Sequence, residues 1–188
     1  AAGYRMFGLT HFFDNEVGGS AHGEGKGGLT PFGRDVIARL DSLSLIIDVA
    51  HASPALIDDV LKLSTRPVVV SHTGVQGTCP GLRNLSDDQL RRIAAKGGVV
   101  GIGFWDGAIC QPTLANAAKA IVYAIKVAGE DHVSLGSDFD GTTTVPIDAS
   151  GYPRLTQALL DAGLTNRQIA LVMGENALRV FRDLLPPQ

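Results

Sequence analysis

The stretch Ile46-Ile47-Asp48-Val49-Ala50-His51-Ala52-Ser53-Pro54 decides the fold. Its first part is largely apolar and β-branched without alternation, as in a strand that is buried on both faces of a parallel sheet. Ser53 then supplies a capping hydroxyl, and Pro54 supplies the fixed φ of a first helical position. The stretch therefore predicts a strand, a histidine at its carboxyl end, and a helix directly after it.

The same pattern recurs along the chain. Short apolar runs predict five strands, at residues 4–10, 45–50, 67–71, 98–104 and 132–137. Amphipathic stretches between and after them predict helices at residues 31–43, 54–63, 86–95 and 114–128, and a helical tail over residues 152–185. Between the first strand and the first helix, residues 18–28 are rich in glycine and predict a flexible loop.

Strands that alternate with helices form a parallel sheet, either open and doubly wound or closed into a (β/α)8 barrel. A doubly wound nucleotide-binding sheet carries GxGxxG or GxxxxGK[ST] after a strand, and neither pattern occurs at a strand-to-helix turn here. A whole barrel takes about 250 residues, whereas this chain has 188. We therefore expect a single domain over residues 1–188, an α/β fold of the (β/α)8 TIM-barrel type in which about five C-terminal β/α units are present and the N-terminal units are missing.

The composition limits the classes of partner. The chain is 45% hydrophobic and 19% charged, with a formal net charge of -3, which is typical of a folded domain. The near-neutral charge, without a basic cluster interleaved with aromatics, argues against nucleic acid. The apolar runs are far shorter than the roughly 20 residues of a membrane span, so we expect none.

Four polar residues follow four of the predicted strands: His11, His51, His72 and Asp138. Catalytic groups gather at this end of parallel strands, because the loops vary there while the strands hold them in place. A lone histidine at such a place is more often a core residue than a ligand, but two on adjacent strands can bind one zinc ion. We therefore expect His51 and His72 to be metal ligands.

Asp138 belongs to Gly136-Ser137-Asp138-Phe139-Asp140-Gly141. Asp140 suits a turn that ends in glycine, whereas Asp138 suits a metal ligand or the general base beside an activated water. Arg83 precedes a predicted helix, where a guanidinium could bind a substrate carboxylate at two points. Asn84 follows it and joins the expected substrate-binding set.

Other polar residues receive no role in the chemistry. His22 and His132 are interpreted as structural or surface residues, and Glu16 and Glu24 as loop residues that bind no metal. The two cysteines, Cys79 and Cys110, are too far apart for a CxxC motif. They are either free thiols or one disulfide.

Seven motifs, taken in order, resemble the renal (membrane) dipeptidase family from one end of the chain to the other. They are Leu9-Thr10-His11, Gly28-Leu29-Thr30-Pro31-Phe32-Gly33, Ile47-Asp48-Val49-Ala50-His51-Ala52-Ser53, Val70-Ser71-His72-Thr73, Arg83-Asn84-Leu85-Ser86-Asp87, Gly136-Ser137-Asp138-Phe139-Asp140-Gly141 and Gly174-Glu175-Asn176-Ala177-Leu178-Arg179-Val180-Phe181.

The resemblance implies a (β/α)8 barrel that binds two zinc ions and cleaves dipeptides with a free C-terminal carboxylate, using zinc-activated water. By similarity, His51 and His72 hold one zinc and Asp138 lies beside the other and handles the proton. His11 contacts the substrate or its tetrahedral intermediate, and Arg83 binds the substrate carboxylate. The family also has counterparts of Cys79 and Cys110 that can pair, which would favour a periplasmic or exported protein; without the disulfide we expect a cytoplasmic one. The resemblance further allows a homodimer.

One departure concerns the family's HxD motif and bridging glutamate, which should lie before His11 and are missing from this sequence. The resemblance therefore implies one zinc half-site and a partial enzyme. Two alternatives stay open. Another binuclear amidohydrolase would need a ligand such as a carboxylated lysine, but Lys26, the only lysine between the first strand and His51, lies in the glycine loop. An inactive partial-barrel remnant would explain the missing ligands but not the retention of His11, Arg83 and Asp138.

Overall fold

The computed structural model describes residues 3–185 and contains one five-stranded parallel sheet. The strands lie in chain order, β1-β2-β3-β4-β5, and every neighbouring pair is parallel. Their bounds are Met6–Gly8 (β1), Ile46–Asp48 (β2), Val69–Thr73 (β3), Val99–Ile102 (β4) and Val133–Leu135 (β5). The expected α/β class is confirmed: the open parallel sheet has the strand order of part of a TIM-type barrel.

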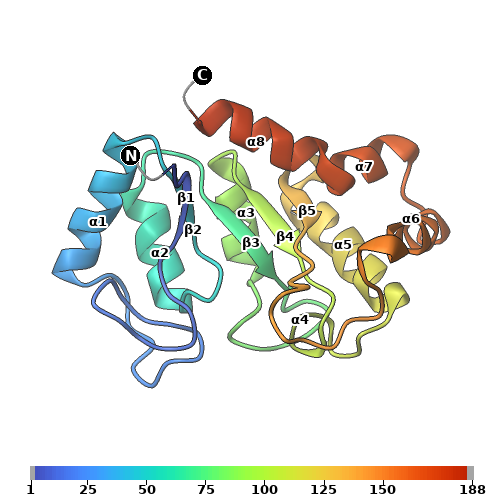
Figure 1. Ribbon diagram of the computed structural model, residues 1–188, viewed down its shortest axis with the longest axis horizontal. Helices are drawn as coiled ribbons and strands as arrows, with labels where there is room; N and C mark the ends of the chain where they lie inside the picture. Colours follow the sequence, from blue (N-terminus) through green and yellow to red (C-terminus); the bar gives the residue numbers. More distant parts are fainter. Residues whose placement is uncertain (1–2, 186–188) are drawn as a thin grey trace.

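The larger helices follow the strands and form a layer against the sheet, with neighbours in the chain also neighbours in space (Figure 1). Their bounds are Pro31–Ser42 (α1), Pro54–Leu63 (α2), Asp87–Ala95 (α3) and Leu114–Ala128 (α5). The predicted starts are confirmed for α1, α2 and α3. In each, the side chain of Thr30, Ser53 or Ser86 accepts a hydrogen bond from a backbone N–H of the first turn, which satisfies a donor that has no partner within the helix.

The C-terminal tail is helical, as predicted, and consists of several segments. They are α6 at Tyr152–Asp161, α7 at Asn166–Ala170, π-helical turn Leu171–Glu175 (η3) and α8 at Asn176–Leu184, and the 3-10 turn Ala149–Gly151 (η2) precedes them. Gly163 separates α6 from α7, because its φ of 88° lies outside the helical region. Thr165 and Gln168 then form a capping box that starts α7. Two further short elements were not predicted: α4 at Asp106–Ile109 and 3-10 turn Glu130–His132 (η1).

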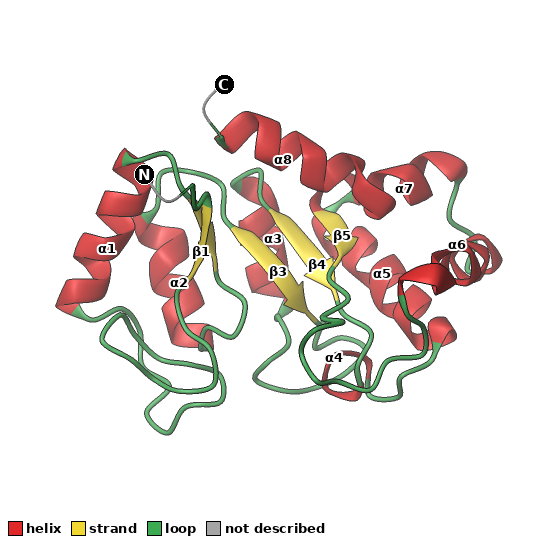
Figure 2. Ribbon diagram, viewed as in Figure 1, coloured by secondary structure: helices red, strands yellow, loops and turns green. Residues whose placement is uncertain are grey.

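The two ends of the sheet have different surroundings (Figure 2). The loops that follow the strands gather at one end, while α8 lies at the opposite end. There Val180 and Leu184 of α8 pack on Ile46, Val69 and Val99, the residues that begin the middle strands. Burying these apolar side chains stabilises that end, and the loop end is left for polar residues. Among residues 3–185, no helix has the length and apolar character to cross a bilayer.

Candidate active site

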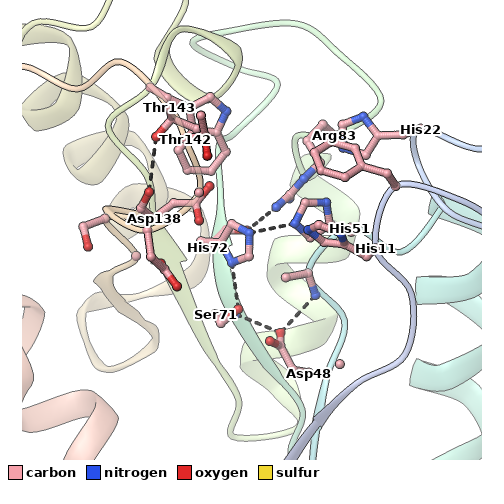
Figure 3. A pocket seen from close by; sticks show the side chains of 18 of the residues that line it. His11, His22, Asp48, His51, Ser71, His72, Arg83, Asp138, Thr142 and Thr143 are labelled. Atoms are coloured by element: carbon pink, nitrogen blue, oxygen red, sulfur yellow. Dashed lines mark hydrogen bonds between the residues drawn. The ribbon is translucent and has the colours of Figure 1, made fainter.

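A pocket of about 920 Å³ opens at the loop end of the sheet. Its lining includes side chains that follow β1, β2, β3 and β5, which is the arrangement expected from the sequence. Figure 3 shows the polar residues around it, with His72 between His51 and Asp138. His11, His51, His72, Arg83 and Asp138 all line this one pocket.

The closest pair in the pocket is His51 and His72. Their Nε2 atoms lie 2.9 Å apart, and their ring centroids are separated by 4.8 Å. The Nδ1 atom of His72 lies 2.8 Å from Ser71 Oγ, and Nδ1 of His51 is buried without a partner in the described part of the chain. Each ring therefore directs its Nε2 atom toward the space between the two rings.

Burial and charge keep these imidazoles neutral. Desolvation, followed by the positive charge of Arg83, lowers the pKa of His51 to about 3 and also lowers the pKa of His72. Asp138 and Asp48 oppose the shift of His72, because their negative charges favour its protonated form. A neutral imidazole has a free lone pair, so the pair is in the protonation state that binds a metal ion.

Two site residues have backbone conformations that L-residues rarely adopt. His51 has a φ of 63° and Asp138 a φ of 53°, both in the left-handed region, where histidine and aspartate are enriched among non-glycine residues. In both cases the chain turns sharply as it leaves a strand. Such conformations concentrate at functional sites because the surrounding structure must hold them.

Asp138 lies across the pocket from the histidine pair. Its backbone carbonyl accepts hydrogen bonds from Gly141 N at 3.0 Å and Thr143 Oγ1 at 3.2 Å, which fixes the loop after β5. Within residues 3–185, however, no three His, Cys, Asp or Glu side chains come close enough to hold one metal ion together. The structure thus brings Asp138 to the same pocket as His51 and His72, but not into a three-ligand cluster with them.

Arg83 forms the cationic side of the pocket. Its Nη2 donates to the backbone carbonyl of His72 at 2.9 Å, and its guanidinium lies 5.7 Å from the ring centroid of Trp105, close enough for a cation–π contact. Burial lowers the pKa of Arg83 to about 10, opposed by Asp48 and Asp138, so it stays charged at neutral pH. A carboxylate entering the pocket would meet this charge.

Asn84 is not among the residues that line the pocket. Its side chain is 1% exposed. Its Oδ1 accepts from Gly74 N at 3.0 Å, and its Nδ2 donates to the carbonyls of Cys79 at 2.7 Å and Gly107 at 3.0 Å. These bonds occupy Asn84 within the protein, where it joins two loops beside Arg83.

The same two loops are joined by a disulfide between Cys79 and Cys110. The pairing that the family resemblance implied is present in the structure. Cys79 follows β3 and Cys110 is the C-cap of α4, so the bond and Asn84 fasten the segment that carries Arg83 to the segment that carries Trp105.

The lining residues that the sequence reasoning missed include His22, Asp48 and Trp105. The ring of His22 lies 5.4 Å from that of His51, because the glycine loop folds back over the pocket and is anchored there. Asp14 accepts from the backbone N–H groups of Ser20 and Gly25 in that loop, both at 2.8 Å. Only the density of glycines hinted at this close backbone approach.

Comparisons with known proteins agree with this geometry. A family model described as membrane dipeptidase (peptidase family M19) matches residues 1–185. An uncharacterised protein encoded near pqqA in Klebsiella pneumoniae is 36% identical over 199 residues, covering 98% of this chain and 73% of that protein. An uncharacterised dipeptidase of Schizosaccharomyces pombe is also 36% identical, over 193 residues, covering 96% of this chain and 46% of that one.

A solved structure gives the same likeness in three dimensions. It is a metallo peptidase from Rhodobacter sphaeroides, liganded with a phosphinate mimic of the dipeptide L-Ala-D-Ala. The TM-score is 0.85 at 28% identity, and the match covers 96% of this chain and 56% of that one. The chain thus spans about half the length of this structure and of the fission yeast relative.

Proposed function

The chain belongs to the membrane dipeptidase family, peptidase family M19, and from that membership we propose that it carries part of a zinc-dependent dipeptidase site. The family is one of metallo-dipeptidases, which are hydrolases. The proposed reaction is hydrolysis of the peptide bond in dipeptides with a free C-terminal carboxylate. The observation that carries the proposal is the convergence of two neutral imidazoles, 2.9 Å apart at Nε2, in a pocket that also holds Arg83 and Asp138.

The histidine pair fits a zinc ion in part. Neutral imidazole nitrogen is a preferred zinc ligand, and the contact between Nδ1 of His72 and Ser71 Oγ is the kind that orients a ligating ring. Zinc in proteins usually has three or four protein ligands, so the pair constitutes a half-site. In the proposal, the remaining ligands for two zinc ions belong to a longer protein, because the fission yeast relative extends well beyond this chain. When bound, zinc supplies Lewis-acid chemistry that polarises a carbonyl and lowers the pKa of water.

The other pocket residues take roles that follow from their charge and place. Arg83 binds the substrate carboxylate, because its guanidinium is fixed by the carbonyl of His72 and by Trp105. Asp138 accepts the proton released in hydrolysis and is the proposed neighbour of the second zinc. His11, whose ring lies 4.4 Å from that of His51, is exposed at the pocket mouth, where it contacts the substrate or its tetrahedral intermediate.

Metal content tests the histidine pair. The protein would be purified without chelator and its zinc measured by inductively coupled plasma mass spectrometry, beside the double variant His51→Ala, His72→Ala. His132→Ala is the matched control, since its Nδ1 bonds Gly98 O at 2.8 Å and it is absent from the pocket lining. We expect about one zinc per chain in the wild type and the control, and a loss of that zinc in the double variant. Equal zinc in all three would refute the assignment.

Substrate charge tests the role of Arg83. A dipeptide and its C-terminal amide would be compared as substrates of the protein supplemented with a segment that carries HxD and glutamate. The amide should be hydrolysed at least about tenfold more slowly, because a charge-assisted bond contributes about 1.5–3 kcal/mol. Arg83→Met should remove this preference. Failure of the supplement to restore any hydrolysis would favour the inactive-remnant alternative.

Compartment and assembly are part of the same proposal. Disulfides such as Cys79–Cys110 persist in oxidising compartments, so we infer an exported or periplasmic protein. We also infer that the chain forms one domain over residues 1–188. Mass spectrometry with and without reductant, on protein alkylated at isolation, would show whether the bond exists in the cell. The homodimer that the family resemblance allowed would be tested by light scattering of the purified protein.

A further inference from the structure

Asp48 is a buried carboxylate that the proposed chemistry does not use. It ends β2 and is 7% exposed. Its Oδ1 accepts hydrogen bonds from Ala50 N at 3.0 Å and from Ser71 N at 2.9 Å. Ala50 and Ser71 are the residues immediately before His51 and His72. One carboxylate oxygen is thus bonded to the backbone on the N-terminal side of both histidines.

The backbone ladder alone does not set this spacing. The register between β2 and β3 consists of the single pair Asp48 and Val69, followed by a bond from Val49 N to Val69 O at 2.9 Å. Beyond that point β2 has ended, and the chain turns at His51 with its φ of 63°. The two bonds to Asp48 extend the connection between the neighbouring segments to the residues that carry the imidazoles (Figure 3).

The same bonds orient one ring. Asp48 fixes the backbone of Ser71, whose Oγ lies 2.8 Å from Nδ1 of His72. When Ser71 Oγ accepts a hydrogen bond from Nδ1, the lone pair of the neutral ring lies at Nε2, the atom that faces His51. Both backbone bonds end on the single oxygen Oδ1, so the arrangement depends on where the side chain places that oxygen and therefore on the length of the side chain.

We propose that Asp48 is a positioning residue that sets the separation and orientation of the His51 and His72 imidazoles, and thereby the affinity of the pair for a divalent metal ion. The inference rests on the proposed function for the metal, but its geometric part concerns only the metal-free chain. The alternatives are that Asp48 acts through its charge or serves the fold alone.

Two conservative variants separate geometry from charge. Asp48→Asn keeps the length of the side chain and an oxygen that accepts both bonds, and removes the charge. Asp48→Glu keeps the charge and displaces the carboxylate by one methylene. The affinity for Zn²⁺ and for Co²⁺, measured by calorimetry and by the visible spectrum of cobalt, should fall about 10-fold to 100-fold in Asp48→Glu, the usual effect of losing a contact that orients a ligand. In Asp48→Asn it should stay within about threefold.

Asp41 provides a matched control. Its carboxylate also accepts a backbone N–H, that of Thr65 at 3.0 Å, and bonds Ser64 Oγ at 3.1 Å, but it does not line the pocket. Asp41→Glu should lower stability without changing metal affinity. A loss of affinity in Asp48→Asn together with wild-type affinity in Asp48→Glu would overturn the positioning role in favour of charge, and an equal loss in both variants would show that the length of the side chain is not what sets the affinity. Unchanged affinity in both variants would overturn it in favour of a purely structural role.

A second readout needs no metal. The nitrogen chemical shifts of the two imidazoles in the metal-free protein report which ring nitrogen carries the proton. We expect His72 to show one fixed tautomer, protonated at Nδ1, in the wild type and Asp48→Asn, and a mixture in Asp48→Glu. A wild type that binds neither Zn²⁺ nor Co²⁺ would defeat the proposed metal pair, while these shifts would still decide the role of Asp48: identical tautomers in all three proteins would overturn it.

Discussion

Removing the disulfide should destabilise the protein by a calculable amount. Cys79 and Cys110 are separated by 31 residues, and closing a loop of this length lowers the entropy of the unfolded chain by an amount worth about 3.7 kcal/mol at 25 °C. The double variant Cys79→Ala, Cys110→Ala keeps the Asn84 bonds that join the same loops. We therefore expect its free energy of unfolding to fall by about 3 kcal/mol, somewhat less than the full entropic value.

The single tryptophan gives the assay a local signal. Trp105 is 8% exposed and lies under Arg83, one residue before α4, whose C-cap is Cys110. Urea unfolding would be followed both by its fluorescence and by circular dichroism, with the wild type measured with and without reductant. The reduced wild type should match the double variant, and reductant should have no effect on that variant. A change in unfolding free energy below about 0.5 kcal/mol would refute the entropic account.

Three further predictions address the loops and the strand ends. Asn84→Ala should destabilise the protein by roughly 3 kcal/mol in urea unfolding, because it leaves the buried N–H of Gly74 and two carbonyls without their partner; a loss under about 1 kcal/mol would contradict this. Gly136→Ala should cost roughly 2 kcal/mol and weaken zinc binding, because the added Cβ would lie 2.3 Å from Ser71 O and 2.8 Å from the Cα of His72; wild-type zinc affinity would argue against it. Backbone N–H groups of Ser20 and Gly25 lower the pKa of Asp14, so its stabilising effect should be complete above pH of about 4 and be lost as the pH falls through the lowered folded-state pKa. Asp14→Asn should therefore flatten the acid limb of the stability curve, and an unchanged limb would show that Asp14 does not contribute to it.

The order of strands and helices was predictable because it depends on local chemistry. Apolar β-branched runs and hydroxyl–proline caps are properties of a few adjacent residues, and both were confirmed by the structure. Strand lengths were not predictable in the same way. The first strand was expected over residues 4–10 but pairs only over Met6–Gly8, because it is an edge strand and its length depends on how far the neighbouring β2 continues beside it.

The sequence contains residues that mark the helix ends within the C-terminal tail, but the amphipathic pattern by itself does not show these ends. Gly163 adopts a positive φ, and Thr165 with Gln168 has the spacing of a capping box. Amphipathic character alone predicts a helical tail over residues 152–185 without placing the ends of its separate helices. Local capping chemistry is the better guide to helix ends when the two disagree.

The residues of the candidate site were likewise predictable where strand ends place them and not predictable where distant contacts do. His51, His72 and Asp138 were expected at one place because the carboxyl ends of parallel strands meet at one edge of a sheet. His22 was left out because its position depends on the closure of the glycine loop by Asp14, a contact between residues that no strand or helix period relates. Asp48 was left out because a single acidic residue in an apolar strand has no pattern of its own.

The histidine pair is held by contacts close to its own two strands, whereas the rest of the site depends on more distant loops. The backbone that carries His51 and His72 comes from β2, β3 and the turns after them, and the hydrogen bonds that fix it run from Ala50 and Ser71 to one carboxylate between the strands. Arg83, by contrast, is positioned by Trp105 and by loops that require a disulfide and Asn84. Loosening those loops should therefore weaken recognition of a carboxylate before it weakens metal binding. We expect reduction of the disulfide to raise the KM for a dipeptide, while the zinc affinity of the histidine pair is retained.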